Sequence, residues 1–375
     1  MTAKSGGTLI LDEIVFAYDK EKGEAFLRRL LGRKPLFTCV IGTTETAKIP
    51  GISAAGKNPE ITHYTPPADV ELLLLGRCEC IPSVPVTPEG IPTPALITRA
   101  ALKLAEIPAI VVSGGLKVRP QVPFIELGGS PGKDIRTGNA VDNAGKVMEK
   151  AIIVGENLAK TVDYLVVGES VPGGTTTALG VLLAMGVAAE GKVSSSMPSN
   201  PHKLKIETVK AGLEASNIKF GALANNPLKA ISCVGDPVMP AFAGLVMGAA
   251  GEVPVLMAGG TQMSAILAII KALKPEVLDN LAIGTTRWII SDKKADIVSL
   301  VKQIAPVPVL AVNLDFSSSK FEGLKAYEAG AVKEGVGAGG ACIAAILKSR
   351  GAISTGEIFV EIEKAYSQLI HSDLR

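Results

Sequence analysis

The chain has 375 residues, of which 47% are hydrophobic, 4% aromatic and 20% charged, and 40 are glycine. Its net charge of +2, with both signs interspersed along the chain, excludes the strong electrostatic attraction that nucleic acids and membrane surfaces exert on basic proteins. The mean hydropathy of +0.35 calls for a check for membrane-spanning segments, and the many small residues favour closely packed α/β layers.

The N-terminal segment, residues 1–15 (MTAKSGGTLILDEIV), has only a few apolar positions before Asp12 and Glu13 interrupt them. This pattern does not match a secretory signal peptide. The first long apolar run follows at 36–44 (LFTCVIGTT) and predicts a buried strand that ends in small polar residues.

Five cysteines are an odd number for a disulfide framework, and we expect reduced thiols and a cytoplasmic location. Cys78 and Cys80 lie two apart, so a metal clip is an alternative to structural thiols. The next segment, Pro82–Pro94 (PSVPVTPEGIPTP), is too rich in proline for a regular element and predicts a rigid loop. A second such loop is predicted at Ser113–Gly138, and long loops inside a compact domain are often functional.

One unit recurs along the chain: an apolar run, then glycine or a small polar pair, then a helical pattern. The apolar runs after the first are 109–115, 164–170, 253–260, 281–286 and 308–316. The helical stretches are Thr176–Ala189, Lys203–Ala215, Pro240–Ala250, Met263–Leu273 and Gly340–Lys348. Continuous apolar runs indicate strands buried on both faces of a parallel sheet, and the alternation predicts a doubly wound, Rossmann-like α/β fold with helices on both faces. Ligands bind such folds beyond the carboxyl ends of the strands, where the glycine-rich segments lie.

The stretch 166–183 (VVGESVPGGTTTALGVLL) approaches the spacing of a nucleoside-triphosphate-binding loop, from Gly168 to Gly173. Gly174 occupies the position that such loops reserve for lysine, so a monophosphate fits better than a triphosphate. Glycines and threonine hydroxyls at a helix N-terminus favour an anion, although a threonine-capped helix after a tight turn would look the same. Capping does not explain Glu169, a carboxylate beside the supposed anion site.

The most apolar region, Pro237–Ile270, is divided by Glu252 and Pro254. Neither half reaches the roughly 20 apolar residues that a membrane-spanning helix requires. We expect a buried helix and a buried strand here, and no membrane partner.

The segment Lys333–Ala341 (KEGVGAGGA) formally matches the spacing G-x-G-x-x-G, but no dinucleotide-binding unit precedes it. Glu334, directly before a flexible glycine run, is a candidate general base, and a solvated surface glutamate is the alternative.

Two other enzyme classes fit the sequence poorly. Transferases that use pyrophosphate-activated ribose carry two adjacent acids after a strand, and 164–170 (YLVVGES) offers only one. A hydrolase triad would need a histidine in a suitable context, and no G-x-S-x-G elbow is present.

Taken together, three stretches resemble the nicotinate-nucleotide:dimethylbenzimidazole phosphoribosyltransferase family, in its divergent archaeal or cyanobacterial branch. They are VVGESVPGGTTT, PAFAGLVMGAAGEVPVLMAGG and KEGVGAGGA, in this order, and the resemblance covers about 105–345. The family displaces nicotinate from nicotinate mononucleotide with an aromatic base such as 5,6-dimethylbenzimidazole, giving an α-ribotide for the lower ligand of cobamides (vitamin B12). The resemblance implies one α/β catalytic domain over 1–375 with a small helical subdomain from about 1–35 and 350–375, and a homodimer.

The resemblance also implies roles for individual residues. Glu334 is the catalytic base and Glu169 a second carboxylate near the ribose or base. The phosphate would be held by Gly173, Gly174, Thr175, Thr176, Lys205, Ser317 and Ser318, and the base pocket would include Pro82, Ser83, Ser113, Gly114 and Gly335. No cofactor and no metal is expected, because nicotinate leaves as a neutral ring and one base suffices for the incoming N–H proton.

The sequence departs from the family pattern in ways that bear on the accepting base. Ser170 replaces a methionine, Gly174 an asparagine, and Ala258 an acidic residue. The accepting base therefore stays open among benzimidazoles, adenine and phenols. A mononucleotide-binding protein or a nucleosidase-like enzyme with a different donor or base is the alternative function.

Overall fold

The computed structural model describes residues 12–56, 58–82 and 84–372, and these build an eight-stranded sheet. The strand order is β1-β8-β7-β6-β5-β2-β3-β4, and every neighbouring pair is parallel except β1 and β8. The strands are β1 (Ile14–Tyr18), β2 (Pro35–Gly42), β3 (Ala109–Gly115), β4 (Ile125–Glu126), β5 (Tyr164–Ser170), β6 (Val255–Ala258), β7 (Leu281–Thr286) and β8 (Val309–Val312). The predicted doubly wound α/β fold is thus confirmed, and each of the six predicted strands lies in the sheet.

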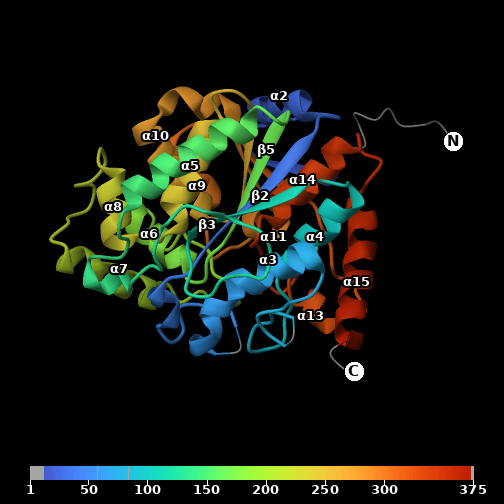
Figure 1. Cartoon of the computed structure of the whole chain (residues 1–375), viewed down its shortest axis with the longest axis horizontal. Coiled ribbons are helices and arrows are strands. Elements are labelled where there is room, and N and C mark those ends of the chain that lie inside the picture. The colour runs from blue at the N-terminus through green and yellow to red at the C-terminus, as the bar shows by residue number, and fades with distance from the viewer. Residues whose placement is uncertain (1–11, 57, 83, 373–375) are drawn as a thin grey trace.

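Helices cover both faces of the sheet (Figure 1). They are α2 (Lys20–Leu30), α3 (Thr65–Leu75), α4 (Ala95–Leu104), α5 (Ala144–Ala159), α6 (Gly174–Ala184), α7 (His202–Ala215), α8 (Pro227–Val234), α9 (Val238–Ala249), α10 (Gln262–Leu273), α11 (Arg287–Ile290), α12 (Ile297–Ile304), α13 (Glu322–Lys325), α14 (Ala338–Lys348) and α15 (Thr355–Ser372). Short 3₁₀ turns are η1 (Glu45–Lys48), η2 (Pro59–Tyr64), η3 (Ile135–Thr137) and η4 (Pro275–Asn280).

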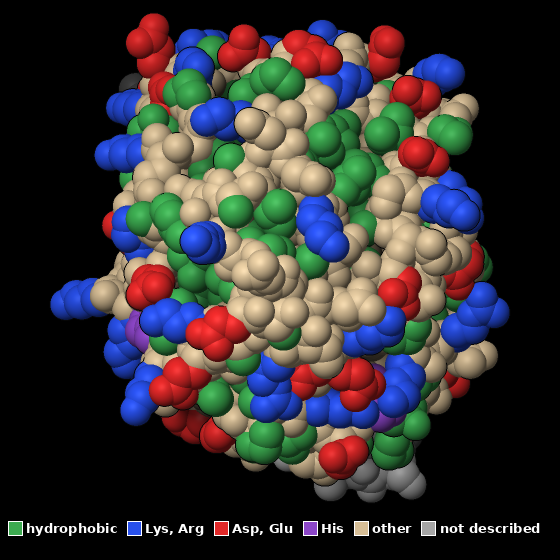
Figure 2. Space-filling view, turned by 90° about the vertical axis from the view of Figure 1, so that its left-hand side faces the viewer, with side chains coloured by type: hydrophobic (Ala, Val, Ile, Leu, Met, Phe, Trp, Pro, Cys, Tyr) green, Lys and Arg blue, Asp and Glu red, His purple; other side chains and the backbone are tan. Residues whose placement is uncertain are grey.

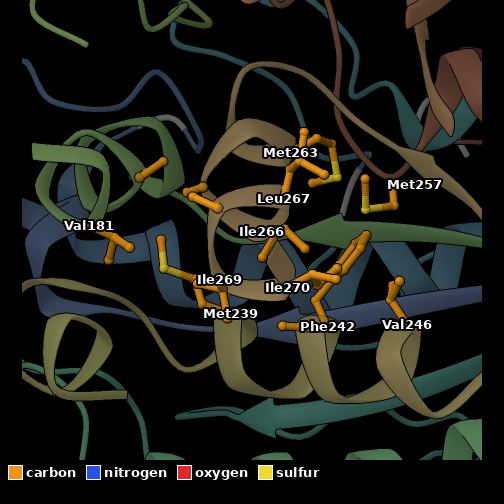
Figure 3. Packing of buried hydrophobic residues seen from close by; sticks show 14 of the residues in the cluster. Val181, Met239, Phe242, Val246, Met257, Met263, Ile266, Leu267, Ile269 and Ile270 are labelled. Carbon is orange, nitrogen blue, oxygen red and sulfur yellow. The ribbon is translucent and has the colours of Figure 1, made fainter. Parts of the chain in front are cut away.

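The core has two layers because alternate residues of each strand point to opposite faces. On β5, Leu165 and Val167 belong to the layer formed with α5, α6, α9 and α10, whereas Tyr164 and Val166 belong to the layer of α4 and α14. Figure 3 shows Phe242 and Val246 of α9 beside Ile266 and Ile270 of α10, close to the sheet. Burial on both faces explains why the strands are uniformly apolar.

The chain ends were expected to be helical, and the structure differs in one place. The segments α2 and α15 are helices, but Ile14–Tyr18 forms the antiparallel edge strand β1 against β8. This strand is only five residues long and mostly half-exposed, so it lacks the continuous apolar run that marks the central strands. The division of the chain ends into a separate subdomain stays a prediction.

The strongly apolar region 237–270 becomes α9, β6 and most of α10, and the buried-helix prediction is correct. Within the described residues no helix is both long enough and apolar enough to cross a bilayer. On the face seen in Figure 2, lysines and arginines alternate with acidic residues instead of forming a patch of one sign.

Candidate active site

A cleft of about 910 Å³, a volume that includes open solvent at its mouth, lies at the carboxyl ends of the central strands. Its floor comes from the residues after β5 and β6 and from the loop before α14, and its outer wall from α3 and the proline-rich loop before α4. Its polar lining residues include Asp69, Thr93, Glu169, Ser170, Thr175, Ser194, Ser195, Ser196, Gln262 and Glu334. The position agrees with the rule that α/β sheets bind ligands beyond their strand ends.

Glu334 lies at the N-terminus of α14, with its carboxylate directed at the first turn of the helix. Its carboxylate oxygens accept hydrogen bonds from the N–H of Gly335 at 3.1 Å, from the N–H of Gly339 at 3.2 and 3.3 Å, and from the Thr285 hydroxyl at 3.5 Å. Burial raises the pKa of Glu334 to about 8, although these N–H groups act in the opposite direction. A carboxylate with a raised pKa, fixed at the floor of a cleft, has the properties of a general base.

The loop that carries Glu334 has an unusual backbone. Val332, Lys333 and Val336 have φ values of 60°, 64° and 52°, in the left-handed region that side chains, and above all β-branched ones, rarely adopt. The loop is held by hydrogen bonds from the N–H of Val332 to the Ser196 carbonyl and from the N–H of Val336 to the Glu169 carbonyl. Strain of this kind persists only where the surroundings fix the backbone, and it is concentrated at functional sites.

The first turn of α14 packs directly on the strand ends because glycines remove the intervening side chains. A Cβ atom on Gly168 of β5 would lie 2.9 Å from the Gly337 Cα, and one on Gly339 would lie 2.1 Å from the Thr285 carbonyl carbon. This close approach brings Glu334 next to β5, the strand that carries Glu169.

Glu169 is 4% exposed and lines the same cleft. Its Oε1 accepts a hydrogen bond of 3.3 Å from the Gln262 side chain. Burial, followed by the negative charges of Asp236, Glu334 and Asp69, raises its pKa to about 8. At neutral pH this carboxyl therefore holds a proton and can donate a hydrogen bond.

The predicted phosphate cradle opens α6, where Gly173, Gly174 and Thr175 line the cleft. Gly173 has a φ of 80° and so allows the tight entry into the helix. The N–H groups of Gly174, Thr176 and Thr177 already donate to the carbonyls of Val171 or Gly173. Anion binding at this turn must therefore depend on Thr175 and on the positive end of the helix.

The serine loop, residues 194–196, supplies hydroxyl donors that the sequence reasoning missed. Ser195 Oγ accepts from the N–H of Met197 at 3.1 Å, and Ser196 Oγ accepts from the N–H of Ala54 at 3.4 Å. Since each oxygen serves as an acceptor within the described chain, each O–H hydrogen can be directed into the cleft. Hydroxyl donors beside a helix N-terminus form a site suited to a phosphate.

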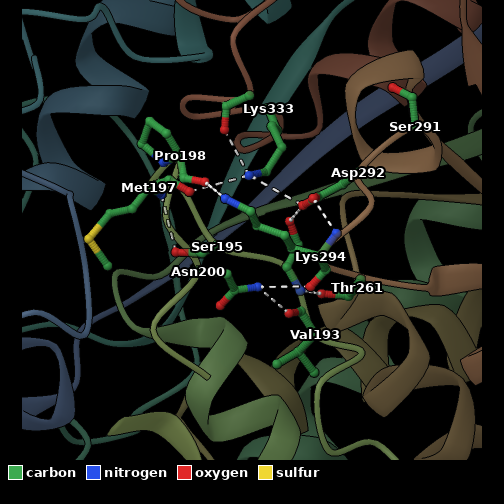
Figure 4. Close-up of polar contacts among 12 residues, drawn as sticks. Val193, Ser195, Met197, Pro198, Asn200, Thr261, Ser291, Asp292, Lys294 and Lys333 are labelled. Atoms are coloured by element: carbon green, nitrogen blue, oxygen red, sulfur yellow. Dashed lines mark hydrogen bonds and ion pairs between the residues drawn. The ribbon is translucent and has the colours of Figure 1, made fainter. Parts of the chain in front are cut away.

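Buried charges hold the serine loop against the Glu334 loop (Figure 4). Lys333 Nζ forms an ion pair of 3.3 Å with Asp292, whose carboxylate also accepts from the Ser194 hydroxyl at 3.1 Å. Lys205, fully buried behind the loop, donates to the Ser194 carbonyl at 2.5 Å. Burial lowers the pKa of Lys205 to about 7, with the charge of Lys333 as a second cause.

A model of the family described as phosphoribosyltransferase matches residues 105–314, more than half of the chain. The chain belongs to the nicotinate-nucleotide:dimethylbenzimidazole phosphoribosyltransferase family. Among its relatives is a UPF0284 protein of Sulfolobus acidocaldarius, which is 49% identical over 89% of this chain and 95% of the relative. Another is a UPF0284 protein of Methanothermobacter thermautotrophicus, which is 47% identical over 86% of this chain and 90% of the relative. Both sources are archaea, in agreement with the expected branch.

The fold is similar to solved structures from Thermus thermophilus. The chain superposes on CobT with a TM-score of 0.60 and 16% identity, over 92% of this chain and 94% of that one. A structure described as nicotinate-nucleotide-dimethylbenzimidazole phosphoribosyltransferase gives a TM-score of 0.55 at the same coverage. At this identity the likeness establishes the fold.

Several residues expected from the family resemblance lie outside the cleft. Ser317 and Ser318 are exposed, because the Ser319 hydroxyl bonds Glu363 of α15 at 2.7 Å and directs the turn toward that helix. Thr176 is buried in the first turn of α6, and Lys205 lies behind the serine loop instead of facing the cleft. None of these four residues is among those that line the cleft.

Only some of the residues predicted for the base pocket lie at the cleft. Gly335 lines the cleft, and so do Pro85–Thr87 and Ile91–Pro94 of the proline-rich loop, but the exposed Pro82 does not. Ser113 and Gly114 are covered, since a Cβ atom on Gly114 would lie 2.2 Å from the Pro237 carbonyl oxygen. Ser83 lies outside the described residues.

The five cysteines form no disulfide, and among the described residues no group of three or more His, Cys, Asp and Glu side chains could hold a metal ion. Cys80 Sγ lies 3.9 Å from the Tyr64 carbonyl oxygen, and its N–H donates to Glu71 at 2.8 Å. With these contacts, Cys80 packs as a structural thiol within the loop.

Proposed function

We propose that this chain transfers the phosphoribosyl group of nicotinate mononucleotide to 5,6-dimethylbenzimidazole or a related aromatic base, giving an α-ribotide for cobamide lower-ligand assembly. The observation that carries the proposal is Glu334, a carboxylate with a raised pKa at the floor of a cleft that is also lined by hydroxyl donors and by the N-terminus of α6. The proposal includes a homodimer and a cytoplasmic location, which suits five cysteines without a disulfide.

In the proposed reaction the bond between the ribose C1′ and the nicotinate nitrogen breaks, and its electron pair stays on the ring nitrogen. The ring leaves neutral, so no general acid is required. The ring nitrogen of the incoming base that carries no hydrogen forms the new bond to C1′ from the opposite face. The N–H proton on the other ring nitrogen passes to Glu334. Glu334 thereby removes the positive charge that would otherwise develop on the incoming ring.

Glu169 has a separate role in this proposal. The carboxyl lies between Gln262 and the Glu334 loop, in contact with the part of the cleft that the ribose would occupy. As an acid it can donate to a ribose hydroxyl, and as an anion it can stabilise the oxocarbenium-like charge at C1′. The pyridinium charge of the donor favours the anionic form on binding.

The serine loop and the start of α6 would bind the 5′-phosphate. Ser195, Ser196 and Thr175 supply hydroxyls, and the helix supplies its positive end. Lys205 and Lys333 would act from behind, by fixing the loop and adding positive charge near the anion.

The test is to incubate the purified protein with nicotinate mononucleotide and a panel of benzimidazoles, adenine and phenols, and to follow free nicotinate and ribotides by mass spectrometry. The proposal predicts nicotinate in equal amount to a new ribotide, and only when an acceptor is present. Nicotinate released without acceptor would identify a nucleosidase-like hydrolase. Tight binding of the mononucleotide with no nicotinate release would instead favour a binding protein.

A further inference from the structure

Three polar side chains from separate segments meet on the outer wall of the cleft. Thr93, in the loop before α4, donates its hydroxyl to Asp69 Oδ1 of α3 at 2.7 Å. Ser170, the last residue of β5, donates to Asp69 Oδ2, also at 2.7 Å. All three line the cleft, and Thr93, Asp69 and Ser170 are 8%, 3% and 5% exposed respectively.

Thr93, Asp69 and Ser170 can only accept further hydrogen bonds, because they have no hydrogen left to donate to a ligand. A hydroxyl has one hydrogen, and both hydroxyls use theirs on Asp69. Thr93 Oγ1 also accepts from the N–H of Ala95 at 3.2 Å, so the free lone pairs belong mainly to Asp69 and Ser170. A ligand that meets this wall must bring an N–H or O–H hydrogen.

Few groups of the protein compensate the charge of Asp69. Among the described residues no lysine or arginine forms an ion pair with it, and two neutral hydroxyls are its hydrogen-bond donors. Burial raises the pKa of Asp69 to about 6, so the group is ionised at pH 8. Removing a carboxylate from water with few donors is unfavourable, and a donor on the ligand would offset that cost.

The trio belongs to the end of the cleft that also holds Glu334. Thr93 is followed by Pro94, whose Cγ would lie 3.2 Å from a Cβ atom on Gly335. Thr98 of α4 ties the same loop by donating to the Val336 carbonyl at 2.9 Å. The Ser195 and Ser196 hydroxyls keep hydrogens that they can offer to an anion. Asp69 repels an anion by its charge, and the Ser170 hydroxyl has no hydrogen left to offer one.

We propose that Asp69 and Ser170 form a specificity subsite for the incoming ring, and that the subsite selects a base with an N–H or O–H donor in addition to the ring N–H that Glu334 takes. The inference rests on the proposed function for the identity of the incoming group. A hydroxylated benzimidazole or an aminopurine meets this requirement, whereas 5,6-dimethylbenzimidazole would place methyl groups against a carboxylate. The carboxylate of nicotinate is excluded from the same wall by charge.

The test measures binding of free rings by titration calorimetry at pH 8, so that it requires no turnover. The matched pairs are 5-hydroxybenzimidazole against benzimidazole and adenine against purine. A hydrogen bond to a charged acceptor should favour the first member of at least one pair by about 10-fold or more. Asp69→Asn and, separately, Ser170→Ala should reduce that ratio several-fold, whereas Glu89→Gln, an exposed acid in the same proline-rich loop, should leave it intact.

Equal affinities within both pairs, or no binding of any ring, would overturn the inference. A ratio that Asp69→Asn leaves unchanged while it weakens nicotinate mononucleotide would also overturn it, because Asp69 would then serve the ribose. Ring selectivity without transfer would support the subsite while contradicting the proposed reaction. Ser170→Ala removes a single oxygen and disturbs the fold less than Asp69→Asn does. If Asp69→Asn does not fold, the Ser170→Ala variant still tests the inference.

Discussion

At the scale of single residues, burial and hydrogen bonding change the pKa of Glu334 in opposite directions. The first turn of α14 directs N–H groups at Glu334, yet burial outweighs them and keeps its pKa near 8. Burial also raises the pKa of Glu169, and the negative charge of Glu334 is one of the charges that disfavour its ionised form. These carboxyl groups therefore hold protons at neutral pH, and the positively charged pyridinium ring of the donor would favour their release.

Replacing the proposed base tests this assignment. We expect Glu334→Gln to lower kcat by about 10²- to 10⁴-fold, because the incoming N–H proton then has no acceptor. Binding of nicotinate mononucleotide should stay within about threefold of the original, since its phosphate is held elsewhere. Steady-state kinetics and calorimetry measure both quantities, with the exposed Glu149→Gln as control. An unchanged kcat would remove Glu334 from the mechanism.

The pH dependence follows from the raised pKa values. A base must be deprotonated, so kcat/KM should rise with pH and level off above about 8, the pKa of Glu334 in the empty cleft. In the complex the pyridinium charge favours the anion, so the midpoint for kcat should lie at lower pH. Initial rates between about pH 5.5 and 9.5 measure the two profiles. A midpoint for kcat above that for kcat/KM would contradict this account.

At the scale of secondary-structure elements, glycines determine how closely the helices approach each other and the sheet. A Cβ atom on Gly155 of α5 would lie 2.2 Å from the Leu245 carbonyl oxygen of α9, and one on Gly248 of α9 would lie 2.2 Å from the Ile152 carbonyl oxygen of α5. The two helices therefore touch through their backbones, and α9 in turn packs on β2, β3 and β5.

We expect Gly155→Ala to destabilise the protein by about 1–3 kcal/mol, because the added methyl group must push the α9 backbone away. Gly145→Ala, on the same helix, has its nearest neighbour at 3.9 Å and should be neutral or stabilising by up to about 1 kcal/mol. Urea unfolding of both variants measures the difference. Equal changes in the free energy of unfolding would show that the close contact between α5 and α9 does not determine the cost of the added methyl group.

The elements that the sequence predicts well are those with a local signal. Continuous apolar runs predict the six central strands, because residues buried on both faces leave no polar alternation. The motifs likewise predict Glu334, Glu169 and the start of α6, which are fixed by the turns in which they lie. The sequence does not predict that Asp69 meets Ser170, 101 positions further along the chain, since that contact depends on how α3 packs over β5. The one signal is the pair of acidic residues, Asp69 and Glu71, within the apolar helix TPPADVELLLL.

At the scale of the whole molecule, the fold buries four carboxylates, three that line the cleft and Asp236 behind it, whose ionisation opposes folding. The pKa values of Glu169 and Glu334 are raised to about 8, and those of Asp69 and Asp236 to about 6, with burial as the main cause in each. Groups with a raised pKa in the folded state stabilise it fully below their unfolded pKa of about 4, and that contribution is lost as pH rises through the folded value.

We therefore expect the free energy of unfolding to fall as pH rises from about 5 to 8. Burial lowers the pKa of Lys205 to about 7. The contribution of Lys205 to the free energy of unfolding therefore rises with pH, but only above about pH 7. Urea unfolding at several pH values measures the trend, and the Glu169→Gln, Glu334→Gln double variant should show a shallower decline. Stability that rises steadily over this range would contradict the buried, protonated state of these groups.

The central claim is that the cleft transfers a phosphoribosyl group to a base on the face opposite to the departing nicotinate. The most direct measurement is the configuration at C1′ of the ribotide formed from nicotinate mononucleotide and an accepted base, determined by NMR of the purified product. We predict the α-anomer, formed by inversion and lost in Glu334→Gln. A β-ribotide, or ribose 5-phosphate without any ribotide, would contradict the account.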